Sequence, residues 1–470
     1  MTPNLSLLKS LRLREFLRID HLQVLSSVFP FEEIDKFDNT GTRDRIYSTE
    51  NTILTMVHSA TQEDKTLQNA VGLFERIYEN QKERILKDAK ASVLREKAED
   101  LKNKEVKRGP KKKYKIKVSK SKTNGISDST AAYSKARKRV KLELMQQIFY
   151  KTCENTGSKA FWYGMETYLT DGTYTQMQDT KELRGIYDVK SKNGNYKEAY
   201  PQGLIQAIIK QGSGIIHNYA LDNRDVSELS LIYKLIHSIP PKSLLLADDL
   251  YNTYAVFSLV RKNDFDIIVP GKRVRNYKVM RQIADGDEIV ELKRTEHPKW
   301  LPKEEILPET ILLRRLSFLS LDGTETMVLY TTLLNEKIPK EEIILKYFTR
   351  WDIEITIREV KTIMDINVLR GKTDDIVKKE LVSAFIAYNL IRKIIAQSTE
   401  GTAFSPERNI IQEFFEGNKE LYIDRKGRVY KRWSSGRYGK TEKENIKEDY
   451  TPKTRKAIPQ KNKERCLQKI

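Results

Sequence analysis

The spacing of apolar residues divides the chain into regions of different predicted structure. In the first part of the chain, apolar residues recur every three or four positions with few helix breakers, as in ENTILTMVHSA (50–60). The segment 129–150 continues this pattern, and Ser127-Asp128 just before it predicts an N-cap. Residues 1–160 are therefore expected to form a helical region.

After this region, short apolar runs alternate with turn signals and helical stretches. The segments ETYLTDGTY (166–174), LIQAIIKQG (204–212) and SGIIHNYAL (213–221) are typical of strands separated by glycine turns. A short apolar run, SLLLAD (243–248), precedes a helical pattern over 251–262. Strands mixed with helices predict an α/β domain.

A third pattern of apolar residues begins near residue 269, where strand-like segments follow one another without helices. Asp285-Gly286 and Asp322-Gly323 are turn signals between these segments. We interpret residues 269–338 as a β-rich insertion. Helical patterns return over about 340–364 and over KKELVSAFIAYNLIRKII (378–395).

The predicted organisation therefore has a helical region, an α/β domain in two parts, an insertion between those parts, and a polar, basic C-terminal region. Their boundaries are 1–160 for the helical region, 161–268 and 339–400 for the α/β domain, 269–338 for the insertion, and 401–470 for the C-terminal region.

Charge is concentrated in two segments of this chain. The formal net charge is +20; residues 102–122 hold eleven Lys and Arg with one Glu, and residues 425–470 hold sixteen with five acidic residues. The rest of the chain is close to neutral. Segments of this kind release counterions on binding a polyanion, which favours DNA or RNA as the partner. Solvated linkers and a membrane surface are the alternatives.

Composition excludes several classes of protein. Cys153 and Cys466 are the two cysteines, so neither a disulfide framework nor a four-cysteine zinc site is expected. Apolar stretches such as 381–391 are interrupted by polar residues and are too short to span a bilayer. No apolar core follows the basic N-terminus, so no secretory signal is predicted. A reducing, cytoplasmic setting is favoured.

The predicted helix over 340–364 carries the most informative group of polar residues. On a continuous helix, Tyr347, Arg350, Glu354 and Lys361 share one narrow face, with apolar residues on both sides of it. A polar stripe between apolar walls indicates a cleft. Its cations can hold phosphates and its carboxylate can hold a metal ion. The alternative is a row of intrahelical ion pairs.

Two further carboxylates are expected at strand ends. Asp171 closes the strand 166–171 before a glycine, and Asp248 ends the run SLLLAD. Ligand clefts of α/β sheets open at such ends, so these acids are candidate metal ligands. Asp-Gly is also an ordinary turn signal, which leaves a structural alternative open for Asp171.

Together these segments resemble the bacterial DDE transposases of insertion sequences, in the group with the Tyr-(2)-Arg-(3)-Glu-(6)-Lys signature. The signature is similar to YFTRWDIEITIREVK, with its spacing intact. LTDGTYTQMQDT resembles the block with the first acid, and LLLADDLYNTY resembles the block with the second. Asp249 stands where relatives often carry Arg, next to the assigned Asp248. The resemblance extends over roughly residues 43–400.

The resemblance implies a ribonuclease-H-like mixed-sheet catalytic domain with a β-rich insertion, preceded by a helical DNA-binding region. Asp171, Asp248 and Glu354 would be the catalytic acids and would hold two Mg²⁺ ions, with Mn²⁺ able to substitute. Tyr347, Arg350 and Lys361 would bind DNA. The implied activity is metal-dependent cleavage at terminal inverted repeats and strand transfer into target DNA, by a homodimer without a nucleotide cofactor or a membrane. The implied location is cytoplasmic, at the nucleoid when DNA is bound.

Two other functions stay open. A transposase-derived DNA-binding protein would bind without nicking, and a related nuclease would cleave without joining. The Gly-Lys-Thr tripeptides at 371–373 and 439–441 do not predict a P-loop, because Ile366 and Ser434 stand where its first glycine is required. Trp300 in the insertion is either a packed residue or a base-stacking residue.

Overall fold

The computed structural model describes most of the central part of the chain. The described residues are 28–37, 46–75, 129–154, 161–188, 199–271, 275–319, 326–398, 421–423 and 429–431. The Lys-rich arm at 102–122 and Cys466 lie outside the described residues, and so does the basic segment 425–470 except for Val429–Lys431. Among the described helices, none has the length and apolar character needed to cross a membrane.

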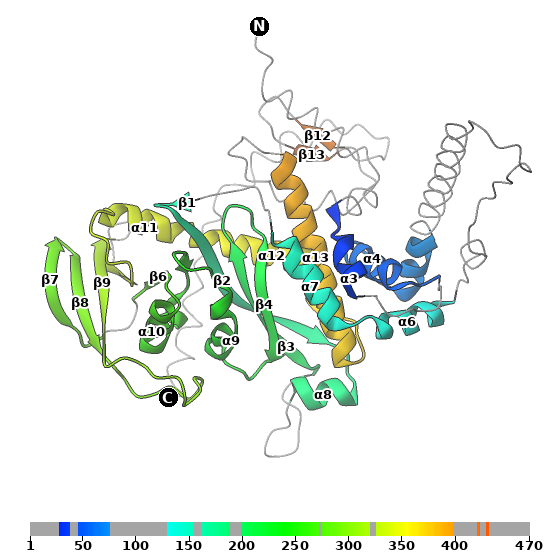
Figure 1. Ribbon diagram of the computed structural model, residues 1–470, viewed down its shortest axis with the longest axis horizontal. Helices are drawn as coiled ribbons and strands as arrows, with labels where there is room; N and C mark the ends of the chain where they lie inside the picture. The colour runs from blue at the N-terminus through cyan, green and yellow to red at the C-terminus, as the bar shows by residue number, and fades with distance from the viewer. Residues whose placement is uncertain are drawn as a thin grey trace, which may run out of the picture.

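A mixed sheet forms the centre of the α/β domain (Figure 1). Three antiparallel strands, β2 (Met165–Met177), β3 (Gln202–Lys210) and β4 (Ile216–Asn223), are consecutive in sequence. β5 (Leu244–Leu246) then pairs parallel to β2, and β6 (Asp266–Pro270) pairs parallel to β5. The mixed α/β class expected from the apolar pattern is confirmed.

The strand-rich segment continues the same sheet. β10 (Thr326–Thr331) pairs antiparallel with β6, and β9 (Thr310–Leu319), β8 (Asp287–Lys293) and β7 (Lys278–Ala284) follow in order. Gly286 makes the β7–β8 turn at φ +62°, and an added Cβ there would lie 2.4 Å from the Ser317 carbonyl oxygen. The second predicted turn, Asp322-Gly323, lies outside the described residues.

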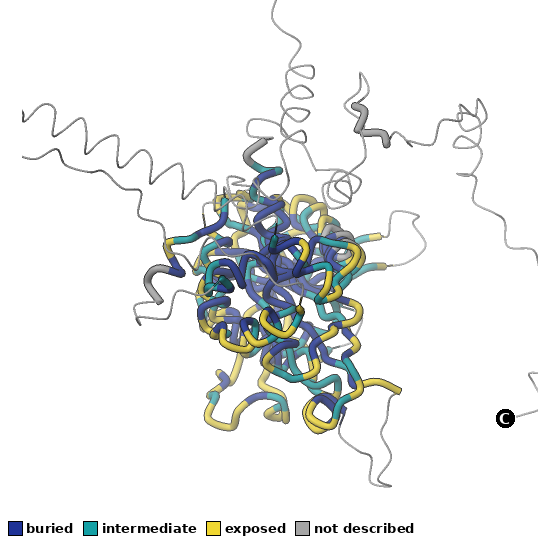
Figure 2. Tube along the Cα trace, turned by 90° about the vertical axis from the view of Figure 1, so that its right-hand side faces the viewer, coloured by how far each residue is buried: buried dark blue, intermediate teal, exposed yellow. Residues whose placement is uncertain are grey.

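Alternation along the strands places apolar residues on both faces of the sheet. On one face, Leu169, Leu246 and Ile268 belong to the core cluster that includes residues of α13 (Asp374–Ser398). On the other face, Leu245 and its neighbours pack against helices α9 (Glu228–Leu235) and α10 (Tyr254–Lys262). Buried residues run through the whole body in Figure 2, whereas exposed residues gather in its outer loops. The central strands are therefore held from both sides.

The N-terminal helices pack on α13, at the opposite end of the sheet from β7 (Figure 1). The helical pattern over 129–150 forms two helices, α6 (Thr130–Arg139) and α7 (Leu142–Thr152), because the backbone is extended at Val140 and Lys141. The expected N-cap was wrong by one position. Ser129, rather than Ser127-Asp128, caps α6, and its hydroxyl accepts a hydrogen bond from the Ala131 amide at 3.3 Å.

The expected continuous helix over 340–364 was also wrong. α11 (Lys340–Phe348) is followed by a 3₁₀ turn, η4 (Thr349–Trp351), and then by α12 (Asp352–Ile363). The Thr349 hydroxyl donates to the Lys346 carbonyl at 2.6 Å and lies 2.8 Å from the Gln211 side-chain amide. These bonds end α11, so one angular period does not relate residues on the two sides of the turn.

Other short elements complete the described structure. They are α3 (Phe31–Phe37), α4 (Thr49–Ala60), β1 (Phe161–Trp162), α8 (Lys181–Tyr187), η2 (Ile236–Ser238), η3 (Asp249–Tyr251), β11 (Val368–Leu369), β12 (Leu421–Ile423) and β13 (Val429–Lys431).

A buried ion pair ties the insertion strands to the segment before α11. Arg314 on β9 is 1% exposed, and its Nε and Nη2 donate to the two carboxylate oxygens of Asp287 at 2.8 and 2.5 Å. Its Nη1 donates to the carbonyls of Asn335 and Ile338 at 3.0 and 2.9 Å. One guanidinium thus satisfies four acceptors on two segments, so its loss would leave a buried carboxylate without compensation.

We expect Arg314→Met to lower the free energy of unfolding by about 3–5 kcal/mol, because Asp287 would remain charged and buried. Urea denaturation followed by circular dichroism measures the loss. The matched control is Lys234→Met, which breaks the more exposed 2.7 Å pair with Asp222 and should cost less than about 1 kcal/mol. Equal losses in the two variants would contradict the proposed importance of the buried pair.

Candidate active site

Strand register places Asp171 and Asp248 side by side. β2 and β5 are parallel, Leu169 is paired with Leu246, and each Asp follows its paired leucine by two residues. Neighbouring strands lie about 4.8 Å apart, and residues two apart point to the same face. Asp171 does not close its strand as expected, because β2 continues to Met177; it lies instead beside the place where β5 ends.

Backbone amides fix one oxygen of each carboxylate. The Gly172 amide donates to Asp171 Oδ1 at 2.9 Å. The Leu250 amide donates to Asp248 Oδ1, also at 2.9 Å, where Asp248 is the N-cap of the 3₁₀ turn η3. Each acid is thus oriented by a backbone amide one or two residues further along the chain.

A third carboxyl group, Glu228, lies close to the same pair. It is in the first turn of α9, and its carboxyl group lies against Gly172: a Cβ built on that glycine would be 2.6 Å from Glu228 Cδ. Burial raises the pKa of Glu228, and the nearby Asp171 and Asp248 raise that pKa further. Three carboxyl groups are therefore within electrostatic reach of one another at one end of the sheet.

Sequence reasoning missed Glu228, because an acid just after the N-cap Ser227 is typical of any helix start. The useful signal was Gly172. A glycine inside a strand often marks the close approach of another group. We interpreted Asp171 as a candidate metal ligand at the close of its strand, with an Asp-Gly turn as the alternative, so the approach of Glu228 to Gly172 was not predicted.

A buried polar network supports Glu228. The Tyr251 hydroxyl donates to Glu228 Oε2 at 3.3 Å and accepts from Gln206 Nε2 at 2.8 Å. The same Gln206 nitrogen lies 2.7 Å from the Thr170 hydroxyl on β2. Burial, and then the charges of Glu228 and Asp248, raise the pKa of Tyr251 well above its ordinary value, so its phenol stays protonated. The network holds Glu228 against the sheet.

Tyr347 and Arg350 reach the same end of the sheet from the other side of the 3₁₀ turn. Tyr347 is 7% exposed and shares a side-chain hydrogen bond with Arg350. Burial raises the pKa of Tyr347, and the charges of Asp248 and Asp249 raise it too, while Arg350 acts in the opposite direction. The structure therefore brings Tyr347 within electrostatic reach of Asp248, and it brings Arg350 next to Tyr347.

Helix α12, which packs against β2, carries the other two candidate residues. The backbone of Glu354 lies in this helix, and its side chain is outside what the structure describes. Lys361, near the end of the helix, is partly exposed. Among the side chains that the structure describes, no three His, Cys, Asp or Glu residues are arranged as a metal site. Trp300 is partly buried and packs against the core on the α9 and α10 face.

Comparison with known proteins indicates the class of this mixed α/β domain and of its two neighbouring acids. Residues 162–390 match the family model described as "Transposase DDE domain". This match confirms the resemblance of this region to the DDE transposases that was inferred from the sequence.

Relatives with similar sequences are bacterial. The chain is 26% identical over 274 residues to "Transposase InsG for insertion sequence element IS4" of Escherichia coli K12, which covers 56% of this chain and 60% of that protein. It is 26% identical over 177 residues to "Putative transposase InsZ" of the same organism, covering 37% and 56%. The matches thus span less than two thirds of the length of either relative.

Among solved structures, the chain is similar to a piggyBac transposase in a synaptic complex with hairpin DNA. That similarity has a TM-score of 0.33 and 9% sequence identity, and it covers 58% of this chain and 55% of the other. The assignment to the DDE transposases therefore depends on the sequence matches.

We expect Gly172→Ala to destabilise the protein by about 1–3 kcal/mol, because the new methyl group would displace the Glu228 carboxyl group. Chemical denaturation of both single variants and of the Gly172→Ala, Glu228→Ala double variant measures the coupling. The alanine at 172 should cost less once Glu228 is truncated.

The control is Gly185→Ala in α8, where nothing lies within 4 Å of the added Cβ. Alanine is the better helix former, so this change should be neutral or stabilise by up to about 1 kcal/mol. Additive effects at Gly172 and Glu228 would contradict the contact.

Proposed function

We propose that this chain is a DNA transposase that cuts DNA at the terminal inverted repeats of an insertion sequence and joins those ends to target DNA. The observation that carries the proposal is the parallel register of β2 and β5, in which Asp171 and Asp248 each come two residues after a paired leucine. Tyr347, which is hydrogen-bonded to Arg350, lies within electrostatic reach of Asp248. The match of residues 162–390 to the transposase DDE domain supports it.

We further propose that the α/β domain is ribonuclease-H-like. In chain order, the central strands are arranged 3-2-1-4-5 (β4-β3-β2-β5-β6), with the first three antiparallel and the last two parallel to the first. Asp171 lies within the first of these strands, and Asp248 follows the fourth. In this proposal, residues 161–268 and 339–400 form the catalytic domain, and 269–338 is an insertion within it.

Asp171, Asp248 and Glu354 are the residues that would hold divalent ions. Their oxygen donors suit Mg²⁺, and Mn²⁺ accepts the same ligands. Glu228 lies within electrostatic reach of Asp171 and Asp248, so a cation bound here would offset repulsion among the three carboxyl groups. When bound, two such ions would supply Lewis-acid activation of the attacking and leaving oxygens of a phosphodiester.

The chain's own residues would position the DNA. The Arg350 guanidinium can hold a phosphate through two parallel hydrogen bonds, and the neutral Tyr347 phenol can donate a third. Lys361 would add a further positive charge along α12. The attacking hydroxyl, from water or from a DNA 3′ end, would lose its proton while the scissile P–O bond breaks in line. Orientation by Arg350 and Tyr347 lowers the barrier to this step.

DNA recognition would involve the parts of the chain outside the catalytic domain. The helical region 1–160, with its arm at 102–122, would read the element's ends. The tail, with its net excess of Lys and Arg, would add salt-dependent, sequence-independent affinity. We propose that the chain acts as a homodimer that holds two ends, without a nucleotide cofactor, and is found in the cytoplasm, at the nucleoid when DNA is bound.

Asp171→Asn, Asp248→Asn and Glu354→Gln are each expected to reduce strand cleavage at least about a hundredfold, because each replaces a charged oxygen ligand by an amide. DNA binding should change by less than about twofold. The assay uses the full chain with labelled DNA that carries the element's two ends, in Mg²⁺, with products separated on a denaturing gel.

Asp249→Asn is the matched control, because Asp249 is the next residue after Asp248 and begins the 3₁₀ turn η3. It should keep cleavage within about tenfold. Loss of cleavage in Asp249→Asn with activity retained in Asp248→Asn would transfer the role to Asp249. Unchanged cleavage in Asp171→Asn would contradict the three-acid site. Cleavage without joined products on a target plasmid would indicate a nuclease.

A further inference from the structure

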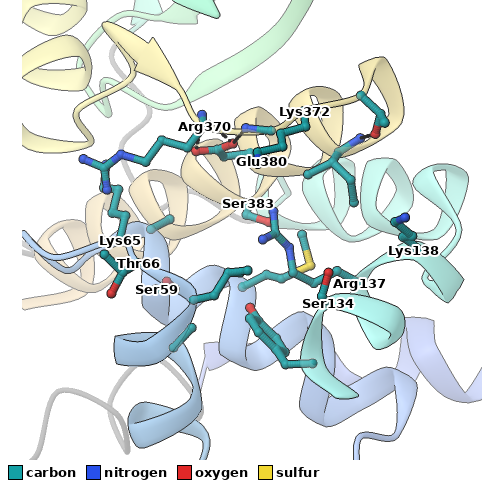
Figure 3. Close-up of a pocket in the computed structure, with 18 residues that line it drawn as sticks. Ser59, Lys65, Thr66, Ser134, Arg137, Lys138, Arg370, Lys372, Glu380 and Ser383 are labelled. Carbon is teal, nitrogen blue, oxygen red and sulfur yellow. Dashed lines mark hydrogen bonds between the residues drawn. The ribbon is translucent and has the colours of Figure 1, made fainter. Parts of the chain in front are cut away.

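A cavity of about 550 Å³ lies where the N-terminal helices meet the beginning of α13 (Figure 3). Its walls come from α4, from the helix that begins at Leu67, from α6, and from the loop 370–373 before α13. None of the residues assigned to the carboxylate site lines it. The volume is in the range of small-molecule sites, about 300–1,000 Å³.

Positive charge dominates the walls of this cavity. Five cationic side chains line it, against the single carboxylate of Glu380; they are Lys65, Arg137, Lys138, Arg370 and Lys372. Glu380 is already used to hold the loop: it accepts hydrogen bonds from the backbone amides of Arg370, at 3.0 Å, and Gly371, at 2.8 Å. Glu380 also lies within electrostatic reach of Arg137 and Lys65, and the five cations of the walls still outnumber this one carboxylate.

Arg137 is the cation of this cavity that has a buried, unpaired hydrogen-bond donor. Its Nε is buried, and no hydrogen-bond partner for it exists among the described residues. The guanidinium lies 5.8 Å from the centre of the Tyr133 ring and points into the cavity in Figure 3. The buried Lys379 donates to the Arg137 carbonyl at 3.3 Å, which fixes the backbone below it. A fixed guanidinium with an unpaired donor is suited to an oxyanion.

The remaining cations are distributed around the opening. Lys65 and Arg370 share Asp365, at 3.9 and 3.3 Å. Within the described part of the chain, no carboxylate forms an ion pair with Lys138 or Lys372. Burial lowers the pKa of Lys65 to about 8, so an anion in the cavity would also favour its charged form.

The floor of the cavity is apolar. It is lined by Met56, Ala60, Leu67, Ala70, Tyr133 and Ile376, with the hydroxyl groups of Ser59, Thr66, Ser134 and Ser383 among them. A small anion alone would not contact these apolar side chains. A ligand with a phosphate at one end and a flat, weakly polar body at the other matches the walls and the floor together.

We propose that this cavity binds one nucleotide unit, with its phosphate on Arg137, Arg370 and Lys372 and its base against the apolar floor. The same chemistry is offered by a free mononucleotide and by a nucleotide of a DNA strand. α6 also presents the exposed Lys135 and Arg139 next to the cavity, where the following phosphates of a strand would lie. The DNA source depends on the proposed function; the cavity's affinity for a nucleotide does not.

The test uses the full chain with two probes, a mononucleotide (dAMP or dTMP) and a fluorescent twelve-residue single-stranded DNA. Affinities are measured by calorimetry for the mononucleotides and by anisotropy for the DNA, at one salt concentration. Arg137→Gln should weaken both about tenfold or more. The control Arg261→Gln removes an exposed arginine of α10 on the opposite face of the sheet, and should change neither by more than about twofold.

A second pair of variants tests the proposal even if Arg137→Gln does not fold correctly. Lys372→Gln removes an exposed lysine at the opening of the cavity, and Lys299→Gln removes an exposed lysine in the insertion. Lys372→Gln should weaken DNA binding by about threefold or more, and Lys299→Gln should not. Weakening of DNA binding alone would assign the cavity to a strand nucleotide. Weaker binding of both the mononucleotide and the DNA would show that the cavity accepts a nucleotide from either source.

Inorganic phosphate is the third probe. It should compete with the mononucleotide but bind far more weakly, because it leaves the apolar floor empty. Equal affinity for phosphate and nucleotide, or unchanged affinities in Arg137→Gln and Lys372→Gln, would overturn the proposal. Nucleotide binding that needs Arg137, in a chain that does not cleave DNA, would overturn only the proposed function. If cleavage is lost in Asp171→Asn, but the affinities for nucleotide and DNA are unchanged in Arg137→Gln and Lys372→Gln, only this inference would be overturned.

Discussion

Repulsion among carboxyl groups at one end of the sheet is the constraint on which the rest of the structure depends. Asp171, Asp248 and Glu228 are close enough for each aspartate to raise the pKa of Glu228. Like charges at this spacing oppose folding unless other interactions hold them. The strands that carry the two aspartates lie between two apolar clusters, and backbone amides bind one oxygen of each aspartate. Packing therefore supplies the stability that the charges remove.

Much of this arrangement could be predicted from the sequence, because it depends on local patterns. Apolar segments separated by glycine turns define β3 and β4, and the short run before Asp248 defines β5. The pairing of Asp171 with Asp248 is not local. It follows from the register of two strands that are far apart in the chain, and only the resemblance to a family brought these acids together before the structure did.

The failures have physical causes of two kinds. The helical face drawn through Tyr347 and Glu354 assumed a constant rotation per residue, and hydrogen bonds of Thr349 with Lys346 and Gln211 interrupt that rotation at η4. Glu228 was missed because its role comes from tertiary contact with Gly172 and Tyr251, which no spacing along the chain encodes. Local propensity predicts elements well, and it cannot predict which side chains meet at their ends.

The pairing of β10 with β6 has a consequence for how such a chain can vary. Because β10, followed by β9, β8 and β7, is hydrogen-bonded directly to β6, these strands cover what would otherwise be an open edge of the sheet. β6 is buried along most of its length and apolar, and an uncovered strand of this kind is a template for aggregation. Removal of β7 to β10 would therefore expose the edge of β6 and would require a new protective edge there.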